Sequence, residues 1–397
     1  MGKKFELTKN YVVNEFGTKL YQIKCTNTFK YAKEGELGGY IEKEENLSQE
    51  GNAWVYGNAW VYGNAWVCSN AQVFDTARVY GNALVHGTAR VFDDAQVSGN
   101  AWVSCNAWVF DDAQVYGNAW VFDDAQVFGN AKVYGNAQVS DNARVSGDAW
   151  VYGNAQVSCN AWVYGNAWVY DDAKVFDTAR VSGNAQVYGN AQVSDNARVS
   201  GDAWVYGNAQ VYGNAWVCDD AQVCDDAKVC DDALVYGNAK VCGNAQVSGN
   251  AQVYGNAWVC DDAKVFDDAQ VFDTALVSGN ARVCGNARVS GDAQVFDDAQ
   301  VSGNAWVSGD AQVSGNACLK SDADHCGFDC FGSSNRHTHA YLTRDNTVEI
   351  TCGCFRGSIE EFEKRVKNTH AGTVYENQYN AIINVIKIKF GLDETSK

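Results

Sequence analysis

The sequence predicts an all-β solenoid, because one six-residue pattern fills about two thirds of its 397 residues. From residue 51 to residue 320 the pattern Gly-Asn-Ala-x-Val-x recurs 45 times without insertion or deletion. Alanine stands at the third position of every hexad, and valine stands at the fifth until Leu319 closes the series. A short fixed period of this kind is typical of a solenoid, in which each repeat contacts only its neighbours. The chain also lacks proline, and a strand paired on both sides has no place for a residue without a backbone N–H.

Each part of the hexad predicts one element of the coil. The alternation Ala-x-Val-x has the two-residue period of a strand, with alanine and valine on its inner face. The Gly-Asn or Asp-Asp pair between strands predicts a corner, because these residues tolerate a positive φ. Three hexads would form one triangular coil of 18 residues, so that the 45 hexads make about 15 coils. At about 4.8 Å a coil, the parallel β-helix would be roughly 70 Å long.

The hand of the coil comes from a resemblance. The hexad of residues 55–60, Val-Tyr-Gly-Asn-Ala-Trp, resembles the hexapeptide repeat of left-handed parallel β-helix proteins. In that family an aliphatic residue points inward, a small residue follows four positions later, and asparagine often occupies the corner. The resemblance implies a left-handed triangular coil, although parallel crossovers are otherwise right-handed in about 98% of cases.

The two ends differ from the repeats, and three domains are expected. Residues 1–50 form an N-terminal cap, residues 51–320 the β-helix, and residues 321–397 a C-terminal α+β module. Strands are expected at 340–342 and 347–351, followed by helices at 359–368 and 374–390, in the order ββαα. Ser358 and Glu361 form a capping box at the start of the first helix, and Gly372 ends it in the left-handed conformation.

Short motifs at both ends resemble uncharacterised proteins of bacteriophages and prophages of gut Firmicutes. The resemblance depends on Leu20-Tyr21-x-Ile23 with Gly38-Gly39 near the start, and on Cys352-Gly353-Cys354-Phe355 followed by Gly357, Glu361-Phe362, Val366 and Thr369-His370 near the end. It implies a phage or prophage origin and no particular chemistry.

Composition limits where the protein works. The first ten residues contain no apolar core of a secretory signal, and no stretch approaches the roughly 18 apolar residues of a membrane span. Fifteen cysteines, an odd number, then favour reduced thiols in the cytoplasm of a bacterial host. A net charge of −18 argues against direct binding of nucleic acid, which normally requires a basic patch.

An acyltransferase is the first alternative, because the resemblance to left-handed β-helix proteins includes many enzymes that use coenzyme A. Those enzymes are similar to one another in having a catalytic histidine and loops that leave the helix to form a pocket. Here the hexads have no insertion, and the only histidine among them is His86, in an outward column. We therefore expect no catalytic residue and no cofactor.

Cysteines suggest two further sites. Near the C-terminus four of them, with His325, His337 and His339, are weak candidates for zinc, because their spacings Cys-x3-Cys and Cys-x-Cys differ from the usual Cys-x2-Cys. Buried free thiols are the alternative. The four candidates are Cys326, Cys330, Cys352 and Cys354.

Within the repeats Cys224, Cys242 and Cys260 are 18 residues apart, so they should stack about 5 Å apart. That spacing is within reach of a disulfide, but in a reducing compartment these residues are expected to substitute for serine or tyrosine.

The acidic residues raise a third possibility, mimicry of DNA by an inhibitor of a host nucleic-acid-binding protein. The hexads hold 29 Asp against 13 Lys and Arg, a net charge of −16. B-DNA would carry about 40 charges over the same roughly 70 Å. Aspartate is also a natural corner residue that keeps a solenoid soluble. Calcium on neighbouring pairs such as Asp93-Asp94 and Asp111-Asp112 is a further alternative.

Outward aromatic residues are the main candidates for a binding surface. All 13 Trp lie in the column between alanine and valine, and two pairs should stack on adjacent coils: Trp102 with Trp120, and Trp150 with Trp168. Exposed aromatic arrays mark interaction surfaces, although ladders of this kind also stiffen a sheet. The leading hypothesis is therefore a non-enzymatic rod-shaped scaffold for a host or phage protein partner, with self-association a further possibility.

Overall fold

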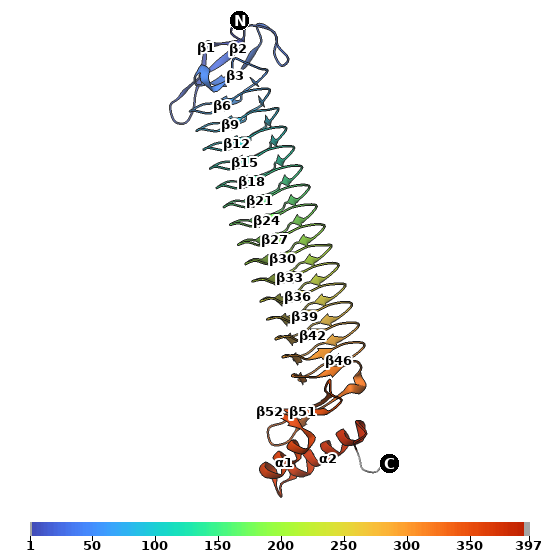
Figure 1. Cartoon of the computed structure of the whole chain (residues 1–397). Coiled ribbons are helices and arrows are strands. Elements are labelled where there is room, and N and C mark those ends of the chain that lie inside the picture. Colours follow the sequence, from blue (N-terminus) through green and yellow to red (C-terminus); the bar gives the residue numbers. More distant parts are fainter. Residues whose placement is uncertain (1, 393–397) are drawn as a thin grey trace. The chain divides into compact units, whose positions relative to one another are not determined.

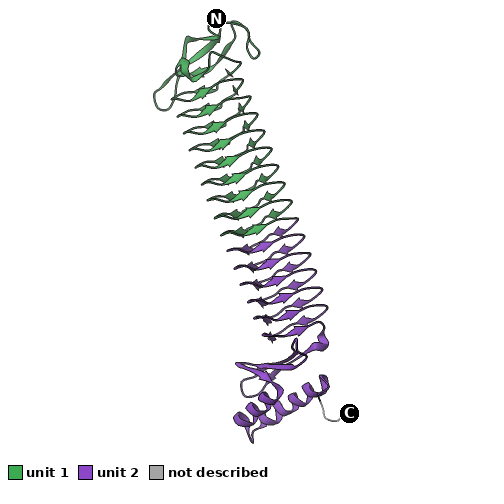
Figure 2. Ribbon diagram, viewed as in Figure 1, with its two compact units in different colours: residues 1–213 green, residues 214–397 purple. Residues whose placement is uncertain are grey.

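The computed structural model describes residues 2–392. These residues form two compact units that divide between Gly213 and Asn214 (Figure 2). The fold is a parallel β-solenoid with a small N-terminal sheet and a C-terminal module of four strands and two α-helices (Figure 1). The hand of the coil stays a prediction from the resemblance. None of the described helices is long and apolar enough to cross a membrane.

Every hexad contributes one strand of two residues, from β4 (Trp54–Val55) and β5 (Trp60–Val61) to β48 (Cys318–Leu319). In both units strands pair in parallel with the strand three hexads further on, as β12 (Trp102–Val103) pairs with β15 (Trp120–Val121). The predicted coil of 18 residues is therefore confirmed. The alanines and valines of the hexads are at most 2% exposed, which confirms a narrow core of small inward side chains.

Corners form where the sequence places Gly-Asn or Asp-Asp. The first residue of every hexad has a positive φ, between 55° and 72°, which glycine adopts freely and aspartate tolerates. In most hexads that begin with aspartate, the carboxylate accepts a hydrogen bond from the next coil, as Asp111 Oδ2 does from the Gly129 N–H at 3.0 Å. Asparagines at the second position form an amide ladder, in which Asn82 Nδ2 donates to Asn100 Oδ1 at 2.9 Å. The acidic residues thus have a structural role at the corners.

The N-terminal segment forms an antiparallel sheet that continues into the solenoid. Strand β1 (Phe5–Val13) pairs with β2 (Lys19–Cys25), and β2 pairs with β3 (Leu37–Ile41). Strand β3 then pairs in parallel with β5, placing Tyr40 opposite Trp60. A short 3-10 helix, η1 (Glu44–Asn46), precedes the first coil. Together these elements satisfy backbone groups that an open first coil would expose.

One tryptophan does not face solvent as the sequence predicted. Trp54 is completely buried, because the N-terminal segment lays Phe5 and Phe29 against its ring at centroid distances of 6.4 and 5.4 Å. Nearby, Lys4 Nζ donates to the Ala53 carbonyl at 2.9 Å, and burial lowers the Lys4 pKa to about 8. The hexad pattern alone does not predict that the N-terminal segment buries Trp54.

The C-terminal module differs from the predicted ββαα order by two additional strands. Its sheet is antiparallel and contains β49 (His325–Phe331), β50 (Arg336–Leu342), β51 (Val348–Cys352) and β52 (Phe355–Ser358). The prediction missed β49 and β52, because neither sequence alternates clearly between apolar and polar residues, and it began β50 four residues late. A short 3-10 helix, η2 (Asp322–Asp324), precedes the sheet.

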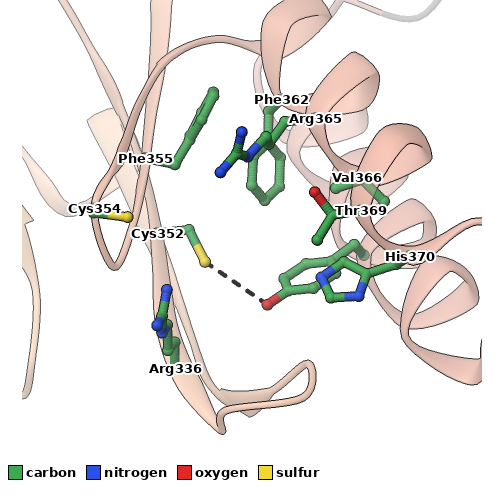
Figure 3. A pocket seen from close by; sticks show the side chains of 10 residues that line it. Arg336, Cys352, Cys354, Phe355, Phe362, Arg365, Val366, Thr369 and His370 are labelled. Carbon is green, nitrogen blue, oxygen red and sulfur yellow. Dashed lines mark hydrogen bonds between the residues drawn. The ribbon is translucent and has the colours of Figure 1, made fainter.

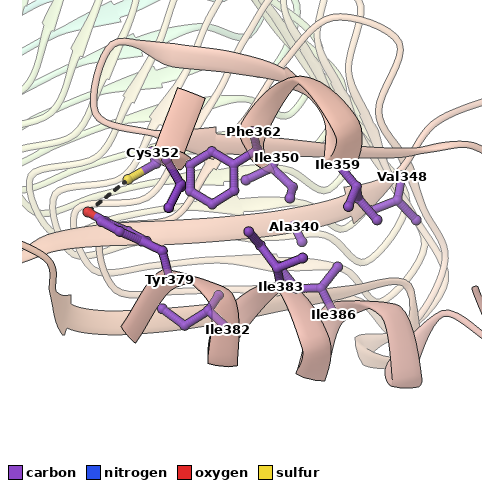
Figure 4. Packing of buried hydrophobic residues seen from close by; sticks show 11 residues of the cluster. Ala340, Val348, Ile350, Cys352, Ile359, Phe362, Tyr379, Ile382, Ile383 and Ile386 are labelled. Atoms are coloured by element: carbon purple, nitrogen blue, oxygen red, sulfur yellow. Dashed lines mark hydrogen bonds between the residues drawn. The ribbon is translucent and has the colours of Figure 1, made fainter. Parts of the chain in front are cut away.

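Both predicted helices are present. Helix α1 (Ile359–His370) begins with the capping box of Ser358 and Glu361, and Gly372 after it has a φ of +74°. Helix α2 (Val374–Lys389) lies beside α1. The two helices cover one face of the sheet, and their apolar residues meet those of β50 and β51 in a single core (Figure 4). Phe362, Ile383 and Ile386 are among its most buried members.

The module is anchored to the last coils of the solenoid. Thr351 Oγ1 donates to the Gln312 carbonyl at 3.1 Å, and the hydroxyls of Ser314 and Tyr341 are 3.3 Å apart. Arg356 also forms an ion pair with Asp297 at 2.9 Å. The module therefore covers the final coil, as the N-terminal sheet covers the first.

Candidate protein-binding surface

The two predicted tryptophan pairs are stacked. The ring centroids of Trp102 and Trp120 are 5.0 Å apart with an interplanar angle of 4°, and those of Trp150 and Trp168 are 5.2 Å apart at 6°. Three of these side chains are exposed, Trp120 by 42%. The 18-residue coil thus brings tryptophans that are distant in sequence face to face at the surface.

A longer tyrosine ladder lies beside the second pair. Six tyrosines in the column after valine stack at centroid distances of 4.8–5.1 Å and within 5° of parallel. Tyr134 and Tyr152 also contact Trp150 and Trp168 edge to face, at 6.2 and 6.5 Å. We call these eight residues the tyrosine–tryptophan patch: Tyr116, Tyr134, Tyr152, Tyr170, Tyr188, Tyr206, Trp150 and Trp168.

The predictions from sequence singled out the tryptophans and missed this run of tyrosines. The signal that finds it is tyrosine at six successive positions spaced 18 residues apart. A second ladder, of phenylalanine, runs along another face, where Phe74, Phe92, Phe110 and Phe128 stack at 4.8–4.9 Å. The phenylalanine ladder has no hydroxyl groups, whereas the tyrosine–tryptophan patch combines flat apolar faces with polar tips, as hot spots of protein interfaces do.

Two tyrosines of the ladder have raised pKa values. Burial, and then the neighbouring tyrosines, raise the pKa of Tyr134 and Tyr170 to about 12. Both phenols therefore stay neutral and keep their hydrogens as donors at any physiological pH. Tyr170 donates to Gln186 Oε1 at 3.2 Å.

Alkaline pH is expected to destabilise the coils that carry the patch. Tyrosines of the unfolded chain ionise near pH 10, whereas Tyr134 and Tyr170 ionise near pH 12 when folded. The unfolded state therefore releases protons first, and stability is lost between about pH 10 and pH 12. Phenolate absorbance and far-ultraviolet circular dichroism should change together in this window. Complete titration near pH 10 with an unchanged dichroism spectrum would contradict this prediction.

The other predicted site residues do not gather into one site. Cys352 is buried in the core of the module, where its Sγ is 3.8 Å from the Tyr379 hydroxyl. Cys326 packs at the edge of that core, while Cys330 and Cys354 are exposed. Among residues 2–392 these four form no cluster of three or more ligand atoms, so the geometry adds no support for zinc there. In the repeats, burial lowers the pKa of His86.

The three C-terminal histidines do lie together. His325 Nδ1 and His339 Nε2 are 3.0 Å apart, and His339 Nδ1 is 3.2 Å from the Gln312 carbonyl. The His337 and His339 rings are 5.7 Å apart. Burial, followed by the proximity of His325, lowers the pKa of His339 to about 3. At neutral pH His339 is therefore a neutral hydrogen-bonding residue between the module and the last coils.

A small pocket of about 110 Å³ opens between the sheet and helix α1 of the module (Figure 3). It gathers the residues of the C-terminal motif, including Cys352, Phe355 and His370. Arg336 and Arg365 also line the pocket and supply positive charge (Figure 3). Its volume accommodates only a small group, and its cationic lining favours an anionic one.

Comparison with known proteins adds one similarity. Parts of the repeat region match the family model described as YdcK Beta solenoid repeat, over residues 113–127, 137–153, 191–207, 245–268, 281–297 and 299–315. No curated protein matches the chain. The matched segments lie within the hexads, so the similarity concerns the solenoid and assigns no catalytic residue. In these segments the chain is similar to YdcK β-solenoid repeats, in agreement with its parallel coils.

Proposed function

We propose that this chain is a non-enzymatic scaffold that binds a protein partner through the tyrosine–tryptophan patch. The observation that carries the proposal is the uninterrupted ladder of six tyrosines beside two stacked tryptophans. The rings are held by in-register coils, so the surface is ordered before binding and loses little side-chain entropy when a partner docks.

Two further features support a scaffold. Strands follow one another every six residues from Trp54 to Leu319, so no loop leaves the repeats to build a substrate pocket. Many aspartates are engaged at corners with the backbone of the next coil, as Asp111 is, and this favours a structural role over mimicry of DNA. The resemblance of both ends to phage and prophage proteins points to a host or phage protein as the partner, in the bacterial cytoplasm.

The test is capture of a partner by the intact chain, compared between two matched variants. In the first variant Tyr134, Tyr152 and Tyr170 are each changed to serine, a residue that the same column carries naturally at Ser98 and Ser278. In the second, Phe92, Phe110 and Phe128 of the phenylalanine ladder are changed to serine. We expect the tyrosine variant to lose affinity by tenfold or more, since single hot-spot residues contribute about 2 kcal/mol.

Circular dichroism must show that both variants keep the fold, because each lost ring pair removes about 0.5–1.5 kcal/mol. Equal capture of the partner by the two variants would contradict the proposed binding surface. Capture of DNA-binding enzymes would favour mimicry, and a thermal shift with coenzyme A would favour an acyltransferase. Light scattering on the wild-type chain distinguishes self-association from a foreign partner.

A further inference from the structure

A row of three thiols runs along one sheet of the second unit. Cys224, Cys242 and Cys260 follow β32 (Gln222–Val223), β35 (Lys240–Val241) and β38 (Trp258–Val259), which pair in parallel with a register of 18 residues. The side chain of Cys242 is hydrogen-bonded to both of its neighbours. The sequence predicts this row, and the structure adds a carboxylate beside it.

Asp225 completes a group of three metal-ligating side chains. The ligand atoms of Cys224, Asp225 and Cys242 all lie within 4.8 Å of one another, and no other such group occurs among residues 2–392. Asp225 stands at the corner after Cys224 with a φ of 58°. Its Oδ2 accepts from the Gly243 N–H at 3.1 Å, so the carboxylate of one coil is held against the coil of Cys242.

The surroundings of Cys242 stabilise a thiolate. The Trp258 indole N–H donates to Cys242 Sγ at 2.8 Å. Thiolates are the form of cysteine that binds metal ions, and an N–H donor to the ligating sulfur is a typical outer-shell contact.

We propose that Cys224, Asp225 and Cys242 bind a thiophilic divalent cation of the zinc type. Zinc takes thiolate sulfur at about 2.3 Å and carboxylate oxygen at about 2.0–2.2 Å, so small side-chain rotations would close the present spacing around one ion. Two thiolates select soft and borderline metals over magnesium or calcium. Three protein ligands leave the fourth tetrahedral position for water. The ion would join two consecutive coils.

Titration of the reduced full-length chain with Cd²⁺ tests this site, with the ultraviolet thiolate-to-cadmium charge-transfer band and competition by a chelator as readouts. Cys242→Ser should remove one tightly bound equivalent. Cys230→Ser is the matched control, because Cys230 also precedes a corner aspartate, Asp231, whose Oδ2 accepts from the Gly249 N–H at 3.1 Å. One coil further on, Ser248 replaces the second thiol.

The same comparison supplies a gain-of-function test. Ser248→Cys places a second thiol beside Cys230 and Asp231 and should add one Cd²⁺ equivalent. Asp225→Asn keeps an acceptor for the Gly243 N–H and should weaken binding by at least about tenfold, since even outer-shell changes cost 10–100-fold. Zn²⁺ should also raise the melting temperature of the wild type and not that of Cys242→Ser. Equal Cd²⁺ binding by Cys242→Ser and Cys230→Ser would overturn the proposal.

Discussion

Alanine in place of Gly39 is expected to detach the N-terminal sheet from the first coil. A Cβ at this position would lie 2.7 Å from the Ala59 carbonyl oxygen and 2.7 Å from Val55 Cγ1. The Tyr40 N–H, one residue further on, donates to the same Ala59 oxygen at 2.9 Å. A backbone shift that relieves the clash would therefore break this hydrogen bond, which joins β3 to the first coil. Overpacking typically costs 1–3 kcal/mol, and we expect a loss of about 3 kcal/mol because backbone atoms cannot rotate away.

Two measurements can show whether the N-terminal sheet detaches. Trp54 is completely buried under the N-terminal sheet, so its emission should shift to longer wavelength in Gly39→Ala. The uncovered edge of the first coil should pair between molecules, which light scattering detects as concentration-dependent association. Leu37→Ala is the control, since Leu37 is 51% exposed in the same strand. Unchanged fluorescence and mass in Gly39→Ala would refute this account of the glycine.

Acid is expected to destabilise the C-terminal module through His339. An unfolded histidine binds a proton near pH 6.5, whereas burial lowers the pKa of folded His339 to about 3. The unfolded state therefore binds more protons between these values. The contribution of His339 to stability is constant above pH 6.5 and falls by about 1.4 kcal/mol for each pH unit below it, until the folded pKa is reached. Burial also lowers the pKa of His325, which steepens the upper part of the slope.

The substitution His339→Gln should lower by about one the number of protons that the chain takes up on unfolding in acid. Urea unfolding at several pH values can be followed by the helical dichroism signal, because in residues 2–392 the α-helices are α1 and α2 of the module. The free energy of unfolding of the variant above pH 7 measures the packing cost of the change. The slope of its free energy of unfolding against pH, below pH 6.5, measures the number of protons that unfolding takes up. A slope equal to that of the wild type would exclude His339 as the acid-sensitive group.

The repeats and the ends differ in how far the sequence determines them. Within the hexads every outward residue has its neighbour 18 positions away, so the stacking of Trp102 on Trp120 and of Cys224 on Cys242 follows from counting. The position of Asp225 relative to Cys242 does not, because it depends on how the corner turns and on the bond to the Gly243 N–H. The sequence therefore shows only the row of thiols and not the approach of Cys224, Asp225 and Cys242 to one another.

In the terminal segments contacts come from residues far apart in the chain. The burial of Trp54 depends on Phe5 and Phe29, and strand β49 forms because β50 offers it a partner edge. The cluster of His325 with His339 needs that same pairing and the Gln312 carbonyl of the last coils. By itself the sequence determined the solenoid, its 18-residue coil and the columns on its faces, because a strict period leaves each repeat only its neighbours to contact. Only the tertiary structure decided which columns the ends cover and which polar groups meet, because those contacts follow no period.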